Sequence, residues 1–251
     1  MLKSERLKTI LQVVKTQKFV TVDELAQALK VSDMTIRRDL NELHKANKIL
    51  RIHGGAQLLS DQIRTEKSYQ QKREIHSKEK YEVAKRACNL IHENDSIYVG
   101  PGTTLELLVA NLKVKHLRIV TNSLPVFEAA KDNMNDYDLI MVGGSYRRIS
   151  GAFVGALANN ELKTMSFSVG FVGVNGINDT SLTTANLEEG QTEGIGLDRS
   201  QIKFVVADYT KLDHSDFHQF YDLRNVDGLI TNHGIEPELE KHYSQFTTIY
   251  K

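Results

Sequence analysis

Hydrophobic residues recur at helical spacing through the first 48 positions of the chain and predict three helices. Their expected buried faces are Leu7, Ile10, Leu11 and Val14, then Val22, Leu25, Ala26 and Leu29, and then Ile36, Leu40 and Leu43. Thr21 and Glu24 form a capping box that opens the second helix, and Ser32 is suited to cap the third. Two β-prone runs around Gly54-Gly55 then predict a hairpin over residues 49–59. Three helices and a hairpin are typical of a winged helix-turn-helix.

Beyond Asp95 the pattern changes to short apolar runs that alternate with helices. The expected strands are residues 96–99, 117–120, 139–142, 167–172, 204–207 and 228–231. This alternation predicts a mostly parallel, Rossmann-like sheet covered by helices on both faces, and therefore the α/β class. We divide the chain into a helix-turn-helix domain at 1–58, a polar linker at 59–75 and the larger sheet domain at 76–251.

Composition narrows the class of protein. No apolar run approaches the ~18 residues that a membrane span needs, and we expect no secretory signal at the N-terminus. The single cysteine, Cys88, excludes an internal disulfide and a cysteine-rich metal site. The nine histidines show no metal-ligand spacing. We therefore expect a cytoplasmic protein with no metal, no cofactor and no membrane partner.

The net charge of zero hides an asymmetry between the two parts of the chain. Residues 1–58 contain 11 Lys and Arg against 6 Asp and Glu, whereas residues 59–251 contain 21 against 26. A basic N-terminal segment joined to a larger acidic segment suggests a module that binds a polyanion such as DNA. Chance alone can also produce an excess of this size.

The third predicted helix carries the side chains best suited to read DNA. With Ile36 and Leu40 in the core, its outward residues are Asp33, Thr35, Arg37 and Arg38. A recognition helix reads bases from its N-terminal turns, where Arg suits guanine and hydroxyls suit phosphates or bases. An ordinary solvated helix face has the same composition. The candidate DNA-binding residues are Ser32, Thr35, Arg37 and Arg38 on the helix, with Arg51 and His53 in the hairpin. For His53 the alternative is a plain hairpin residue.

Three loops after consecutive predicted strands are rich in glycine or small polar residues. They are Gly100-Pro101-Gly102-Thr103-Thr104, Thr121-Asn122-Ser123 and Gly143-Gly144. The first opens a helix, whose free amides and two hydroxyls suit a phosphate, although a tight turn explains a single such loop equally well. Because ligands of parallel sheets bind at the carboxyl ends of the strands, three such loops predict a polar pocket there.

Charged residues near the same sheet edge extend this candidate pocket. Arg147 follows the third loop and suits a phosphate clamp, or else a surface charge. Asp208 ends another strand with Lys211 close behind, which suits sugar hydroxyls and phosphate, or else a salt bridge. The candidate effector-binding residues are therefore Gly102, Thr103, Thr104, Asn122, Ser123, Gly143, Gly144, Arg147, Asp208 and Lys211.

Several separated motifs resemble the DeoR family of bacterial sugar-metabolism repressors. They are Arg6, Ile10 and Val14, then Ser32-x-x-Thr35-Ile36-Arg37-Arg38-Asp39-Leu40, and then Ile52-His53-Gly54-Gly55-Ala56. The resemblance implies a second domain that is similar to ribose-5-phosphate isomerase and senses a phosphorylated sugar. It also implies operator DNA as a partner. Because helix-turn-helix modules act in pairs on paired half-sites, we expect a homo-oligomer, a dimer or a tetramer.

Within the family the chain looks most like the lactose phosphotransferase system repressors. The residues that carry this likeness are 100–104, 121–126, 152–155 and 158–159. It implies tagatose 6-phosphate as the effector and lactose or galactose catabolism as the pathway. One departure leaves other effectors open, fructose phosphates among them: Thr192-Glu193 stands where many members have Lys or Gln, and an acid repels phosphate.

An isomerase that carries a DNA-binding module is the alternative class. Isomerisation needs a base and a group that stabilises the enediolate. The run Val172-Gly173-Val174-Asn175-Gly176-Ile177 offers no carboxylate and no lysine, and Glu188 and Glu189 have no evident electrophilic partner in the sequence. We expect no enzyme activity and no catalytic residues.

Overall fold

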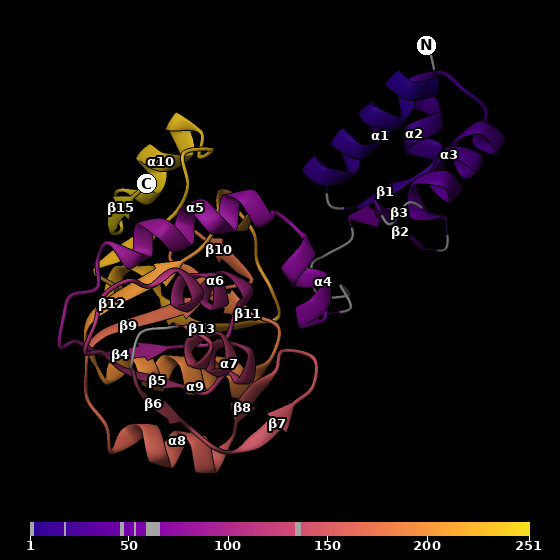
Figure 1. Ribbon diagram of the computed structural model, residues 1–251. Helices are drawn as coiled ribbons and strands as arrows, with labels where there is room; N and C mark the ends of the chain where they lie inside the picture. Colours follow the sequence, from indigo (N-terminus) through magenta and orange to yellow (C-terminus); the bar gives the residue numbers. More distant parts are fainter. Residues whose placement is uncertain (1–2, 18, 46–47, 53, 59–65, 134–136) are drawn as a thin grey trace. The chain divides into compact units, whose positions relative to one another are not determined.

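The computed structural model describes residues 3–17, 19–45, 48–52, 54–58, 66–133 and 137–251. The chain forms two compact units, Met1–Thr65 and Glu66–Lys251 (Figure 1). Part of the segment expected as a linker, residues 59–65, lies outside the described residues. The rest of that segment, from Glu66 onward, belongs to the second unit and contains a helix.

The first unit has the three helices and the hairpin that the hydrophobic pattern predicts. Its elements are α1 (Lys3–Gln17), β1 (Phe19–Thr21), α2 (Val22–Leu29), α3 (Asp33–Lys45), β2 (Ile49–Ile52) and β3 (Gly55–Leu58). The core residues Ile10, Val14, Leu25, Ile36 and Leu40 have no exposed surface. The pattern did not predict β1, a strand of three residues that pairs antiparallel with β3 and gives the sheet order β1-β3-β2.

Polar contacts fix the ends and angles of these helices. The Glu24 amide donates to Thr21 Oγ1 at 3.2 Å and the Thr21 amide to Glu24 Oε2 at 2.7 Å, which is the expected capping box. Lys30 ends α2 in the left-handed region, at φ 51°, and so makes the short turn to α3 without a glycine. Arg6 donates from Nε to Asp39 Oδ2 at 2.5 Å and thereby ties α1 to α3.

The second unit is an α/β structure around a parallel sheet of seven strands. Its helices are α4 (Tyr69–Glu74), α5 (Ser77–Cys88), α6 (Thr103–Asn111), α7 (Leu124–Lys131), α8 (Ala156–Lys163), α9 (Leu187–Asp198) and α10 (Pro237–Tyr243), with the 3₁₀ helices η2 (Tyr209–Lys211) and η3 (Leu223–Asn225). The sheet contains β4 (Ser96–Val99), β5 (Arg118–Thr121), β6 (Asp138–Met141), β9 (Phe167–Gly173), β12 (Ser200–Val206), β14 (Gly228–Ile230) and β15 (Thr248–Tyr250). Smaller sheets contain β7 (Ser145–Arg147) with β8 (Ala152–Val154), and β10 (Gly176–Asn178), β11 (Ser181–Thr184) and β13 (His218–Asp222).

The spatial order of the large sheet differs from the order along the chain. The strands lie as β15-β14-β12-β9-β4-β5-β6, and every neighbouring pair is parallel. The chain runs outward from β4 through β5 to β6 and then crosses back to β9 on the other side of β4. The order therefore reverses at β4, and ligands of open α/β sheets bind in the crevice at such a point.

Alternating side chains of the strands fill two hydrophobic cores, one on each face of the sheet. Ile97 and Val99 pack with residues of α5, α6 and α7, whereas Tyr98 between them packs with residues of α8, α9 and α10. All six strands predicted from the sequence are present within a few residues of the expected bounds, and β15 adds a seventh. None of the helices in the described part of the chain is long and apolar enough to span a membrane.

Candidate DNA-binding surface and ligand pocket

The N-terminal turns of α3 present polar and cationic side chains to solvent. Arg37 and Arg38 are exposed and Thr35 is partly exposed. Ser32 caps the helix, accepting from the Thr35 amide at 3.4 Å, and its hydroxyl lies 3.0 Å from Thr35 Oγ1. Met34 is 79% exposed. Sequence reasoning missed it because it belongs neither to the buried apolar face of the helix nor to the outward polar and charged residues. An exposed apolar side chain here suits a thymine methyl group.

Of the two hairpin residues expected to contact DNA, the structure describes Arg51 alone. Arg51 donates from Nη1 to Asn41 Oδ1 at 2.5 Å and so links β2 to α3. His53 lies outside the described residues. Gly54 has φ 83°, a conformation that favours glycine, and its carbonyl accepts from the Val22 amide at 2.9 Å.

A polar pocket lies at the carboxyl ends of β4, β9 and β12. Its wall includes Gly102, Thr103, Thr104, Asp208 and Lys211, five of the residues proposed from the sequence. Gly102 begins α6 at φ 146°, and no side chain caps this end of the helix. The first amides of α6 are therefore open to an anion, and the hydroxyls of Thr103 and Thr104 have no hydrogen-bond partner within the described residues.

Three lysines from separate elements line this pocket: Lys72 of α4, Lys80 of α5 and Lys211 of η2. Lys80 is only 5% exposed, and burial, with Lys211 nearby, lowers the pKa of its ammonium to about 8. Burial also lowers the pKa of Lys211, against the opposing effect of Asp208. Both lysines are thus desolvated cations that a bound anion would stabilise. Sequence reasoning missed Lys72 and Lys80, because both lie in a polar segment remote from the strand ends.

Carboxyl groups line the same pocket. Asp208 is 1% exposed; its Oδ1 accepts from the Thr210 amide at 3.1 Å, whereas its Oδ2 is buried without a partner. Glu189 and Glu193 of α9 are each 4% exposed. These acids share the pocket with the three lysines, which reach it from other parts of the chain.

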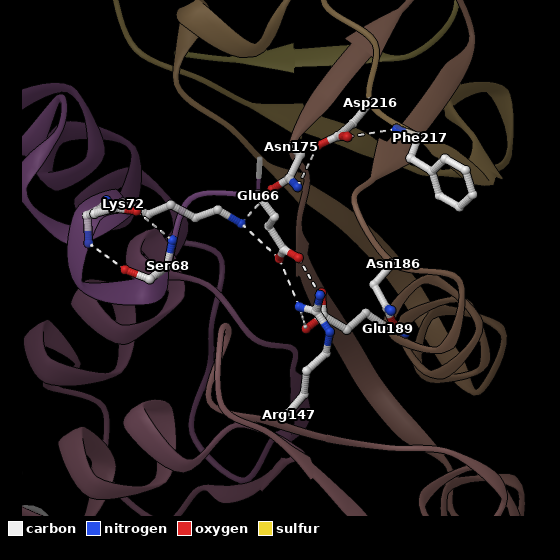
Figure 2. Close-up of polar contacts among 10 residues, drawn as sticks. Glu66, Ser68, Lys72, Arg147, Asn175, Asn186, Glu189, Asp216 and Phe217 are labelled. Atoms are coloured by element: carbon white, nitrogen blue, oxygen red, sulfur yellow. Dashed lines mark hydrogen bonds and ion pairs between the residues drawn. The ribbon is translucent and has the colours of Figure 1, made fainter. Parts of the chain in front are cut away.

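Arg147 contacts carboxylates of the protein itself. Figure 2 shows its guanidinium between Glu66 and Glu189. Nη1 donates to Glu66 Oε1 at 2.8 Å and to Glu189 Oε1 at 3.1 Å, and Nη2 also bonds Glu66. Lys72 lies 3.8 Å from Glu66 and donates to Asn175 Oδ1 at 3.1 Å. Glu66, the first residue of the second unit, is thus held beside the pocket wall.

The loops after β5 and β6 have structural contacts elsewhere. Asn122 is fully buried, accepts from the Tyr98 hydroxyl at 2.9 Å and donates to the Phe153 carbonyl at 2.9 Å. Ser123 caps α7. The Gly143 amide donates to Glu161 Oε2 at 3.3 Å, and Gly144, at φ 153°, packs against β8. None of these residues belongs to the described lining of the pocket, because β5 and β6 extend away from β4 on the side opposite to β9.

Comparison with known families gives a clear result for both units. The DeoR-like helix-turn-helix domain matches residues 6–62, and the DeoR C terminal sensor domain matches residues 75–233. The chain belongs to the DeoR family. The resemblance seen in the sequence motifs is therefore confirmed, as is the fold class of a winged helix-turn-helix followed by a larger α/β domain.

Curated members of the DeoR family resemble this chain along nearly its whole length. A lactose phosphotransferase system repressor of Lactococcus lactis is 42% identical and covers 99% of this chain and 98% of its own. Repressors of the same name from Streptococcus mutans and Staphylococcus aureus are each 35% identical, over 99% and 95% of this chain. These relatives are named as repressors and not as enzymes. A solved ribose 5-phosphate isomerase in complex with phospho-erythronic acid aligns over 55% of each chain, with 17% identity and a TM-score of 0.42.

Proposed function

We propose that the chain is a DNA-binding repressor of a sugar-utilisation operon, relieved by a phosphorylated sugar. In the first unit, Ser32, Thr35, Arg37 and Arg38 of α3 bind the operator, with Met34 as an apolar contact. Arg51 and His53 of the hairpin complete the interface. The exposure of the two arginines at the N-terminal end of α3 supports this assignment.

The ligand-binding half of the proposal depends on one observation. The uncapped start of α6 and three lysines line the same pocket as Asp208, whose Oδ2 is buried without a partner. Amides and ammonium groups suit a phosphate, and an unpaired carboxylate oxygen suits a sugar hydroxyl. The proposed effector site therefore consists of Gly102, Thr103, Thr104, Asp208 and Lys211, with Lys72 and Lys80 added.

The best candidate for the effector is tagatose 6-phosphate, from lactose or galactose catabolism. The names of the relatives and the likeness in residues 100–104 and 121–126 support it. Fructose phosphates are the second candidates, since they offer a phosphate and hydroxyls of the same kind. Because helix-turn-helix modules read paired half-sites, the active form is a dimer or a tetramer, which light scattering of the full chain measures.

The test compares operator affinity with and without sugar. For the parent we expect tagatose 6-phosphate to lower the affinity for operator DNA, and free tagatose to have no effect because it lacks the anion. Thr103→Ala combined with Thr104→Ala removes two hydroxyls and keeps the amides, so a weaker response with unchanged sugar-free DNA binding is expected.

The outcomes separate the parts of the proposal. An unchanged response in the double variant, or an equal response to free tagatose, would remove the α6 loop from the site. A parent that responds to fructose 6-phosphate and not to tagatose 6-phosphate would move the chain to another sugar pathway. A parent that responds to neither sugar phosphate would refute sugar-phosphate control.

A further inference from the structure

Two polar side chains in the pocket, apart from its lysines, make no hydrogen bond with the part of the chain that the structure describes. Glu193 of α9 is 4% exposed and lines the pocket, and its carboxyl makes no hydrogen bond and no ion pair with the described residues. Ser150, in the turn between β7 and β8, also lines the pocket, and its Oγ is buried without a partner. Unpaired buried polar atoms cost free energy, so such atoms in a pocket wall indicate a ligand.

The two buried carboxyl groups of α9 differ in their hydrogen-bond partners. Glu189 and Glu193 are four residues apart and therefore share one helix face. Arg147 donates to Glu189 at 3.1 Å, as Figure 2 shows, and this carboxylate is already paired. Glu193 lies one turn further along the helix and has no hydrogen-bonded cation among the described residues, although the charge of Lys72 acts on it from a distance. Of the two acids, Glu193 is the one that keeps its whole hydrogen-bonding capacity for a ligand.

Burial also changes the charge that Glu193 brings to the pocket. Loss of solvation, and then the neighbouring Glu189, raise the pKa of Glu193 well above its usual range. A raised pKa favours the neutral form of the carboxyl, which both donates and accepts hydrogen bonds and does not repel a phosphate. This removes the objection that an acid at this position is incompatible with a phosphorylated ligand.

We propose that Glu193 and Ser150 bind hydroxyl groups of the ligand and make the pocket selective for polyhydroxylated phosphates over phosphate itself. The proposal rests on the proposed function, since it concerns the same pocket. The α6 amides and the lysines recognise the anion, which every phosphorylated compound has. Glu193, Ser150 and the free Oδ2 of Asp208 add three oxygen groups that only a ligand with several hydroxyls can satisfy together.

The experiment measures two ligands against three variants of the full chain by calorimetry and thermal unfolding. Tagatose 6-phosphate probes the whole site, and inorganic phosphate probes the anion site alone. The variants are Glu193→Ala, Ser150→Ala and the matched control Glu188→Ala, an exposed acid on the same helix. We expect the affinity for tagatose 6-phosphate to fall about tenfold in Glu193→Ala and about threefold to tenfold in Ser150→Ala.

Two further readouts distinguish ligand recognition from a structural role. The affinity of both variants for inorganic phosphate should stay within about twofold of the parent, because phosphate alone does not need the hydroxyl-binding groups. Without ligand, Glu193→Ala should unfold at the same or a higher temperature than the parent, since it loses a buried unpaired acid. The control Glu188→Ala should match the parent in every measurement.

Two results would overturn the inference while the proposed function stands. One is an equal loss of affinity for both ligands, which indicates general damage to the pocket. The other is an unchanged affinity of both variants for tagatose 6-phosphate when the parent binds it. A parent that binds neither tagatose 6-phosphate nor fructose 6-phosphate would refute the proposed function and this inference with it.

Discussion

Burial of Lys80 in the pocket disfavours the charged form of its ammonium, whereas a bound anion would favour that form. Its ammonium is 5% exposed, donates to the Lys72 carbonyl and has a pKa lowered to about 8 by burial. In the unfolded chain its pKa is close to 10.5. Between these values the unfolded state binds more protons than the folded state, so without ligand the free energy of unfolding rises with pH through this window.

Ligand binding should show the opposite dependence on pH. A phosphate dianion favours the charged form of Lys80, and this form is lost above pH 8. We therefore expect the affinity for tagatose 6-phosphate to fall between pH 7 and pH 9, as measured by calorimetry. Lys80→Arg should retain more of its affinity over the same interval because a guanidinium stays charged. An equal loss of affinity in the parent and in Lys80→Arg would show that the titrating group is not Lys80.

Asn122 and Arg147 show the limit of reading single residues from the sequence. Both residue types suit a sugar phosphate, and both follow strands of the sheet. Asn122 is instead enclosed by Tyr98 and the Phe153 carbonyl, and Arg147 by two carboxylates. Their partners lie between 24 and 81 positions away along the chain, and no local pattern indicates such a contact.

At the scale of elements, α3 is the part of the first unit that should determine operator binding. We expect Arg37→Ala and Arg38→Ala each to weaken it, by about 1–3 kcal/mol for an arginine that contacts a base. An arginine that contacts only phosphate should instead weaken binding to all sequences and lower the salt slope by about one unit. Fluorescence anisotropy at several salt concentrations distinguishes the two.

The matched control for α3 is Lys163→Ala, which removes one exposed positive charge from α8 of the second unit. It should leave operator affinity unchanged. Should both arginine variants bind operator as tightly as this control at each salt concentration, α3 would not be the recognition helix.

Most elements could be predicted because their signals are local. Thr21 and Glu24 form their capping box within four residues, and the strands of the large sheet contain short apolar runs. Proximity between elements was less predictable. The expected pocket combined the loops after β4, β5 and β6, which are consecutive in the sequence, with Asp208 and Lys211 after β12, whereas the observed pocket combines the ends of β4, β9 and β12. The loops after β5 and β6 lie outside its described lining, because strand order depends on where the chain crosses back.

For the whole molecule, Glu66 connects the pocket to the DNA-binding unit through the chain itself. It is the first residue of the second unit and follows directly on Thr65. Its carboxylate is 12% exposed, bonds Arg147 and lies 3.8 Å from Lys72, which lines the pocket. We expect a bound phosphate that recruits Lys72 to withdraw this cation from Glu66. Pocket occupancy should then change how firmly the start of the second unit is held, which is the differential contact that coupling between two sites requires.

This coupling predicts a specific phenotype for Glu66→Gln, which keeps the shape of the side chain and removes its charge. Tagatose 6-phosphate should still bind, since Glu66 is not part of the described pocket lining, and sugar-free operator binding should persist. The ratio of operator affinities without and with the sugar should move toward one. By linkage, operator DNA should then have an equally reduced effect on sugar affinity, so calorimetry and anisotropy must report the same ratio. Glu74→Ala, an exposed acid of α4, is the control and should keep the parental ratio. A parental ratio in Glu66→Gln as well would show that coupling passes through other contacts.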